Sequence, residues 1–306
     1  MIRSETLSPS AGSQPSSSAP ADLPHNRTNG FLLLPALVAF LPLLAGSLAV
    51  LLRESVKPHI PGRVGGADEG FTLKNYTELF DPAYIHYFTD TFRIGLVITL
   101  AALVLGYPIA HYIVRVASPR RRKALLAGLI GMLFLSLIVR VYAIAMTYGP
   151  LGPLVNAPLL IGIQPRTPLH TELLVIFGLL HTVLPLVAIT LIGALQNINP
   201  RLEEAALSLG APRWKAFTAI TLALSVPGIL SAAIIGYAFC ISNFVVPMIL
   251  GKGFVLFISN LIYARFSEVN NFPSGAAIAV IMTLISLALF YGLMKLVQLA
   301  SRAEAR

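Results

Sequence analysis

A long polar stretch separates two strongly apolar segments of this 306-residue chain. It reads Glu204-Ala205-Ala206-Leu207-Ser208-Leu209-Gly210-Ala211-Pro212-Arg213-Trp214-Lys215-Ala216-Phe217-Thr218-Ala219-Ile220-Thr221-Leu222. A glutamate and two alanines open it, a glycine lies four residues after that triplet, and an isoleucine and a leucine close it. The flanking segments are almost free of charged residues, so this stretch marks a place where the chain must meet water.

The composition is that of an integral membrane protein. Hydrophobic residues make up 56% of the chain, charged residues make up 11%, and the mean hydropathy is +0.78. Soluble globular domains carry about 25% charged residues. A helix needs about 20 mostly apolar residues to cross a bilayer, and the dyad alternation of a membrane β-strand is absent here. We therefore expect an all-α membrane protein with six transmembrane helices, at residues 31–52, 94–114, 124–148, 173–195, 228–250 and 276–298.

The positions of the basic residues predict how the chain crosses the membrane. Most of the 22 Lys and Arg residues fall in the N-terminal tail, at the C-terminal end and in the connections 115–123 and 196–227. The alternate connections carry most of the acidic residues. Because cytoplasmic loops carry the basic excess, both termini and the polar loop are expected in the cytoplasm. The net charge of +9 is then a topology signal, and we expect no nucleic-acid partner.

This topology divides the chain into four parts. Residues 1–29 are rich in Ser, Pro and Ala and are expected to form a disordered cytoplasmic tail. Residues 30–93 hold the first transmembrane helix and an external loop, and residues 94–298 form a five-helix core that contains the polar loop 196–227. Residues 299–306 are expected to form a cytoplasmic C-terminal tail.

The first half of the polar loop predicts a short helix that ends in a rigid turn. An Asn-Pro dipeptide at 199–200 is a start signal, and Glu203 and Glu204 follow in the first turn, where the helix dipole favours negative charge. Gly210 permits a sharp turn, and Pro212 cannot continue the helix.

The second half of the loop predicts another short amphipathic helix, which starts at Arg213. Trp214 and Phe217 are three residues apart and share one face of it. From chemistry alone, two interpretations are open. The two helices form a compact knob on the cytoplasmic side, or the second one lies in the headgroups with Trp214 as an aromatic anchor.

The loop resembles the EAA loop of ABC-importer permease subunits in its triplet, its glycine and its Ile220-x-Leu222 end. The family pattern usually places a proline directly after the leucine, whereas this chain has Ala223 and reaches a proline only at Pro227. The chain also resembles spermidine/putrescine-type permeases over about residues 71–298. The blocks that carry this resemblance are Phe71-Thr72-Leu73-Lys74-Asn75-Tyr76, Leu105-Gly106-Tyr107-Pro108 and Val139-Arg140-Val141-Tyr142.

The resemblance implies a type I ABC-importer permease and the partners that drive it. Partners would be a second permease subunit, a cytoplasmic ATPase dimer and a periplasmic solute-binding protein, in the bacterial inner membrane. The chain has no G-x-x-x-x-G-K-(S/T) phosphate cradle, so we expect a non-catalytic subunit without a cofactor, with ATP and Mg²⁺ bound by the partner ATPase. The residues expected to couple to that ATPase are Glu203, Glu204, Ala205, Ala206, Gly210, Arg213 and Trp214.

Polar side chains at membrane depth are costly and are therefore candidates for a substrate path. Within the predicted spans these are Arg140, Tyr142, Tyr148 and Asn243. For Arg140, a structural pair with a carboxylate or with helix-end carbonyls is an equally open interpretation. No pair of His, Cys or carboxylate residues has ligand spacing within a span, so we expect no metal site.

The resemblance favours import of a polyamine such as spermidine or putrescine by alternating access. Related permeases carry opines, iron, thiamine or sulfate, and these solutes are the alternatives. A secondary transporter would need acidic residues in its spans for the coupling ions, and the six predicted spans contain none. A membrane scaffold whose knob recruits a partner without transport is the third alternative.

Overall fold

The computed structural model describes residues 29–62, 65 and 70–304, which are mostly helical and contain no strand. The predicted tail 1–29 lies outside these residues except for Asn29. The chain divides into two units, residues 1–48 and 49–306, and α1 (Asn29–Ser55) begins in the first and ends in the second. The expectation of an all-α chain is confirmed for the described residues.

Four helical runs in the described part of the chain are long and apolar enough to cross a membrane, and a bent pair of shorter helices would make a fifth. The four runs are Pro82–Val116, Pro168–Gln196, Arg213–Ser242 and Phe272–Lys295. The first predicted span, 31–52, is helical within α1 but is not among them. The prediction of six transmembrane helices is therefore confirmed only in part.

The second predicted span lies in a longer helix. After α2 (Lys74–Thr77) and η1 (Glu78–Phe80), α3 (Pro82–His111) starts well before residue 94 and continues through the π-helical turn η2 (Tyr112–Val116). Asp81 sets this start, because its side chain accepts a hydrogen bond from the Ala83 amide at 2.9 Å and Pro82 follows at the first helical position. The N-cap at Asp81 lies ahead of the apolar run, so α3 includes polar residues that precede the predicted span 94–114.

The predicted third span, 124–148, is bent. It consists of α4 (Pro119–Phe134) and α5 (Leu137–Tyr148), which meet at 90°. Leu135 and Ser136 between them have extended ψ angles of 130° and 128°, so the helical hydrogen-bond ladder stops there. Neither residue is a helix breaker, which is why the sequence pattern predicts one continuous helix.

The predicted fourth and sixth spans agree with α6 (Pro168–Gln196) and α12 (Phe272–Glu304). The fifth, 228–250, is divided at Asn243 and Phe244 into α9 (Ala223–Ser242) and α10 (Val245–Leu250). The other described helices are η3 (Ala157–Ile161), α7 (Arg201–Ser208), α8 (Arg213–Ala216), η4 (Phe217–Leu222), α11 (Ile258–Tyr263) and η5 (Ala264–Glu268).

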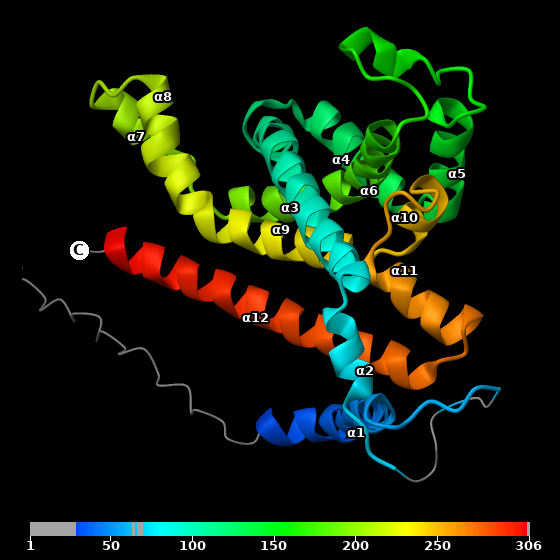
Figure 1. Cartoon of the computed structure of the whole chain (residues 1–306). Helices are drawn as coiled ribbons and strands as arrows, with labels where there is room; N and C mark the ends of the chain where they lie inside the picture. Colours follow the sequence, from blue (N-terminus) through cyan, green and yellow to red (C-terminus); the bar gives the residue numbers. More distant parts are fainter. Residues whose placement is uncertain (1–28, 63–64, 66–69, 305–306) are drawn as a thin grey trace, which may run out of the picture. The chain divides into compact units, whose positions relative to one another are not determined.

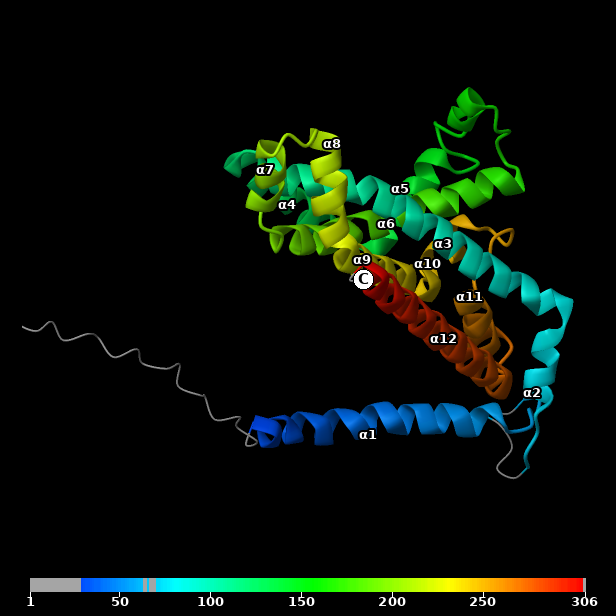
Figure 2. The same cartoon turned by 90° about the vertical axis from the view of Figure 1, so that its left-hand side faces the viewer.

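The core of the second unit is the contact among α3, α6 and α9 (Figure 1). Two glycines of α9 let it approach α6 closely. A Cβ built on Gly236 would lie 2.9 Å from Val187 Cγ2, and one built on Gly228 would overlap the Cβ of Ala194. The helix α12 runs beside α9 and α11 (Figure 2) and joins a smaller cluster around Leu79.

We predict that Gly228→Ala destabilises the protein. The added methyl group cannot rotate away from Ala194, so α6 and α9 must separate, and overpacking of this kind costs about 1–3 kcal/mol. The unfolding temperature in detergent should fall. Gly193→Ala on α6 is the matched control, because a Cβ there meets nothing within 4 Å. Equal unfolding temperatures for the two variants would contradict the proposed close contact.

Candidate functional site

The first half of the polar loop folds as its residues predict. The Arg201 amide donates to Asn199 Oδ1 at 3.1 Å, and α7 follows with both glutamates in its first turn. Gly210 has a φ of +87°, which residues with a Cβ rarely adopt, and Pro212 then precedes α8. The predicted turn is confirmed.

The second half of the loop differs from the prediction. Instead of a separate short helix, α8, η4 and α9 form one helical run from Arg213 to Ser242. Pro227 lies inside this run and does not end it. Trp214 in α8 therefore belongs to the same helical run as α9, and Figure 1 shows that this run bends between α8 and α9.

Glu203 fastens the two halves of the loop to each other. Its Oε2 accepts a hydrogen bond from Thr221 Oγ1 at 2.6 Å, which joins the first turn of α7 to η4. Thr221 is only 1% exposed, and hydrogen bonds to charged groups are about twice as strong as neutral ones. Glu204, next in sequence, is exposed. The two glutamates thus have different surroundings, one internal and one facing outward.

The loop is also fixed to the end of α3 and η2. The Phe217 ring packs edge-on against Tyr107 and His111, with ring centroids 6.2 Å and 5.1 Å apart. Arg115 Nη2 donates to the backbone oxygen of Ile198 at 2.9 Å. These contacts hold both ends of the loop against one helix, so the loop and α3 must move together.

The outer surface of the loop mixes apolar, small and charged side chains. Leu209 and Trp214 have 89% and 64% of their surfaces exposed. Ala205 and Arg213 are exposed as well, and Ala206 is half-buried. Large exposed apolar groups among charged ones are typical of a protein interaction surface or of a membrane-surface anchor.

Arg140 is buried on α5 with much of its hydrogen-bonding capacity unused. The residue is 9% exposed, and no described residue accepts a hydrogen bond from its Nε or Nη1. None of the ion pairs in the described part of the chain includes it. The carboxylate partner that the sequence left open is therefore not found among the described residues.

The other three path candidates have different surroundings from Arg140. Tyr142 is half exposed, at 50%. Tyr148 packs edge-on against Phe177, with centroids 5.8 Å apart, and lines an apolar cavity of about 470 Å³. Asn243 Oδ1 accepts a hydrogen bond from the Val246 amide at 3.1 Å, so its side chain caps the break between α9 and α10.

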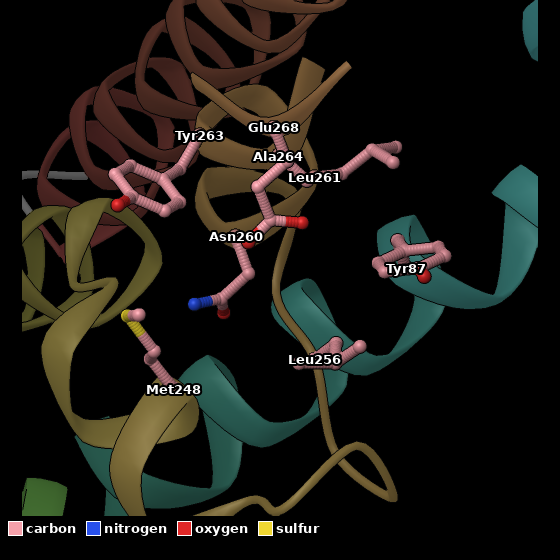
Figure 3. A pocket seen from close by; sticks show the side chains of 8 residues that line it. All are labelled: Tyr87, Met248, Leu256, Asn260, Leu261, Tyr263, Ala264 and Glu268. Carbon is pink, nitrogen blue, oxygen red and sulfur yellow. The ribbon is translucent and has the colours of Figure 1, made fainter. Parts of the chain in front are cut away.

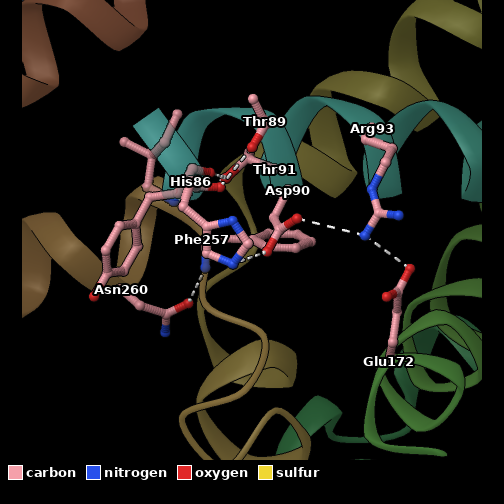
Figure 4. Close-up of polar contacts among 10 residues, drawn as sticks. His86, Thr89, Asp90, Thr91, Arg93, Glu172, Phe257 and Asn260 are labelled. Carbon is pink, nitrogen blue, oxygen red and sulfur yellow. Dashed lines mark hydrogen bonds and ion pairs between the residues drawn. The ribbon is translucent and has the colours of Figure 1, made fainter. Parts of the chain in front are cut away.

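Sequence reasoning missed an ionic network between α3 and α6 (Figure 4). Arg93 Nη2 lies 2.9 Å from Glu172 Oε1 and 3.4 Å from Asp90 Oδ1, and His86 Nε2 lies 3.1 Å from Asp90 Oδ2. The signal was the i, i+3 and i, i+4 spacing of His86, Asp90 and Arg93 on one helix face. Asp90 and Glu172 lie just before the predicted spans 94–114 and 173–195 but inside the longer helical runs Pro82–Val116 and Pro168–Gln196. Both carboxylates are engaged in this network.

No group of three or more His, Cys, Asp or Glu residues in the described part of the chain could hold a metal ion. Cys240 is buried in α9 as a free cysteine.

Comparisons with known proteins identify relatives of this chain. Residues 102–302 match the family described as binding-protein-dependent transport system inner membrane component. The spermidine/putrescine transport system permease protein PotB of Escherichia coli (strain K12) is 31% identical over 217 residues, which cover 70% of this chain and 78% of that protein. PotB of Haemophilus influenzae is 30% identical over 222 residues, which cover 72% and 77%.

A solved structure shares the fold. A bacterial alginate ABC transporter, in complex with an alginate pentasaccharide-bound periplasmic protein, superposes with a TM-score of 0.69 and 21% identity. The match covers 87% of this chain and 92% of that one. The family match spans more than half of the chain, and the PotB relatives cover more than two thirds of it. The chain therefore belongs to the binding-protein-dependent transport system inner membrane components, the permease subunits of bacterial ABC importers.

Proposed function

We propose that this subunit moves a polyamine such as spermidine or putrescine from the periplasm to the cytoplasm by alternating access, powered by a partner ATPase. Family membership already makes it a multi-pass permease of the bacterial inner membrane, a non-catalytic kind of subunit. The observation that carries the mechanism is the braced polar loop between α6 and α9. The choice of a polyamine is supported by the names of the PotB relatives.

The loop is built to transmit a displacement rather than absorb it. The hydrogen bond between Glu203 and Thr221 and the rings around Phe217 leave α7 little freedom relative to α3. One end of the loop follows α6 directly, and the other continues into α9. A push on the exposed surface around Glu204 and Trp214 is thus delivered to three helices that are in contact with each other.

The partners of this motion are those that the family implies. An ATPase dimer, which binds ATP and Mg²⁺, docks on Glu204, Ala205, Ala206, Gly210, Arg213 and Trp214, with both termini of the chain on the same cytoplasmic side. A second permease subunit completes the path, and a periplasmic solute-binding protein delivers the solute. Approach of the two ATPases opens the path outward, and hydrolysis of ATP resets it.

Arg140 is the residue of this path that the structure supports most strongly. Burial of a guanidinium group whose N–H groups lack acceptors is costly, so a function must offset that cost. We infer that its acceptors come from the solute path or from the second permease. Tyr142, Tyr148 and Asn243 are weaker candidates because their surroundings differ, and Asn243 already caps α10. The fold itself does not select the solute, since a transporter with the same fold carries alginate.

The direct test is uptake of radiolabelled putrescine into proteoliposomes that contain the complex assembled from this chain, its co-purifying permease and ATPase, and the binding protein. Uptake that depends on ATP inside the vesicles is expected. A complex that assembles but takes up another solute and no polyamine would contradict the polyamine assignment. A chain that binds no ATPase would contradict the coupling role.

We predict that Glu204→Lys leaves the protein inserted in the membrane and abolishes both ATPase association and uptake. The substitution reverses the charge of an exposed group on the proposed docking surface, and like charges across an interface cost several kcal/mol. Co-purification of the ATPase measures the effect. Glu78→Lys is the control, because Glu78 is a solvent-exposed carboxylate far from the loop in sequence. Normal uptake by the Glu204 variant would refute the coupling assignment.

We predict that Thr221→Val loosens the loop. The side chain keeps its shape but loses the hydroxyl that donates to Glu203, and a hydrogen bond to a charged group contributes about 1.5–3 kcal/mol. Hydrogen exchange of residues 201–208 should become about tenfold faster or more. Thr218→Val is the matched control, since the Thr218 hydroxyl bonds only to carbonyls of its own helical run. Unchanged exchange in the Thr221 variant would show that this bond does not brace the loop.

We predict that Arg140→Met lowers uptake by at least about tenfold, equal to ~1.4 kcal/mol, while the complex still assembles. Removal of a buried guanidinium without partners should leave the unfolding temperature of the isolated chain unchanged or higher. Arg120→Met, in the exposed start of α4, is the control and should leave uptake near normal. If the Arg140 variant fails to assemble, the residue has a structural role instead.

A further inference from the structure

A small cavity lies between the start of α3, the helix α10 and the segment α11–η5, and none of the four path candidates lines it (Figure 3). Its volume is about 180 Å³, room for about six water molecules at ~30 Å³ each. The residues that line it are Tyr87, Met248, Leu256, Asn260, Leu261, Tyr263, Ala264 and Glu268. A carboxylate, an amide and two phenol rings thus face this space, and the other four lining residues are apolar.

The carboxylate of Glu268 has no counter-ion in the described part of the chain. The ion pairs there do not include it. Arg265, three residues earlier, turns toward Tyr84 instead: it donates to the Tyr84 hydroxyl, and its guanidinium lies 5.3 Å from the centre of that ring. In Figure 3 the Glu268 side chain extends into the space between Tyr87 and Tyr263. The cavity therefore presents one solvent-exposed carboxylate that has no ion-pair partner among the described residues.

The aromatic walls of the cavity suit a cation. The ring of Tyr263 is held by stacking on Phe244, with centroids 5.5 Å apart, and Tyr87 packs with the cluster around Leu79. Neither phenol hydroxyl has a hydrogen-bond partner among the residues that the structure describes. A ring face attracts an ammonium group, and a nearby carboxylate strengthens the attraction.

The side-chain amide of Asn260 is engaged by hydrogen bonds within the chain. Its Oδ1 accepts from the Phe257 amide at 3.0 Å, and its Nδ2 donates to the Phe244 carbonyl at 2.9 Å. These bonds fix the segment before α11 against the break after α9. The floor of the cavity is therefore rigid, which preserves its shape when a ligand enters.

We propose that this cavity binds one ammonium group of an alkyl polyamine, with Glu268 as its counter-ion and Tyr87 and Tyr263 as its aromatic walls. The proposal rests on the proposed polyamine function and locates a binding step within this chain. Glu268 lies in the connection 251–275, which the charge pattern places on the external side, so the amine would occupy the cavity before it enters the membrane path.

The test is isothermal titration of the full chain in lipid nanodiscs with putrescine, and with 1,4-butanediol as the uncharged analogue of similar length. We expect saturable binding of putrescine and at least about tenfold weaker binding of butanediol. Glu268→Gln, which keeps the shape and removes the charge, should weaken putrescine binding at least about tenfold. Tyr263→Leu should weaken it about threefold or more. Glu78→Gln, another exposed carboxylate on the predicted external side, should bind as the wild type does.

The outcomes separate this cavity from the transport function. Equal affinity of the wild type and Glu268→Gln for putrescine, equal affinity for the diol, or no binding to the wild type would each overturn the cavity assignment. If the reconstituted complex imports putrescine and Glu268→Gln keeps the wild-type KM, the importer stands and the cavity does not. If putrescine binding depends on Glu268 but the complex imports no polyamine, the cavity stands and the polyamine function fails.

Discussion

The polar loop of this permease depends on the close contact between α6 and α9, the two helices that it connects. Gly228 faces Ala194 near the polar loop, and Gly236 faces Val187 further along the same helix pair. Lipid offers helices no hydrophobic drive to associate, so small residues that allow close packing must supply it. With α3 against both helices, the loop between α6 and α9 has a fixed base. If α6 and α9 could slide past each other, the contacts of Glu203 and Phe217 would not hold the loop in place.

Two neighbouring glutamates of the loop lie in different surroundings. Glu203 and Glu204 are identical in chemistry, yet one bonds to the buried Thr221 and the other faces outward. Each residue of a helix is rotated by about 100° from the one before it, so Glu203 can bond to Thr221 while Glu204 faces the proposed docking surface. The rotation along a helix also places Arg140 and Tyr142, two residues apart on α5, on different sides: Arg140 is buried and Tyr142 is half exposed.

The sequence predicted those parts of the fold that depend on composition and on strong local signals. The apolar runs at 173–195 and 276–298 and the turn at Gly210 are such signals. The breaks at Ser136 and Asn243 were missed because no proline or glycine stands there. At the second break, Ser259 and Asn260 donate hydrogen bonds to the backbone oxygens of Asn243 and Phe244. The continuous helix from Arg213 was missed because Pro227 lies inside it. The ion pair between Arg93 and Glu172 and the cavity at Glu268 depend on residues far apart in the chain, which a single sequence does not bring together.

The π-helical segment η4 (Phe217–Leu222) lies between α8, which carries part of the proposed docking surface, and α9 in the same helical run. A π-turn accommodates one residue more than an α-turn, so the side chains before it are out of phase with those after it by about 100°. Trp214 therefore points in a direction that the periodicity of α9 alone would not give. The extra residue sets a fixed angle between the side chains of α8 and those of α9. Its removal would leave both the docking surface and α9 intact but aim one away from the other.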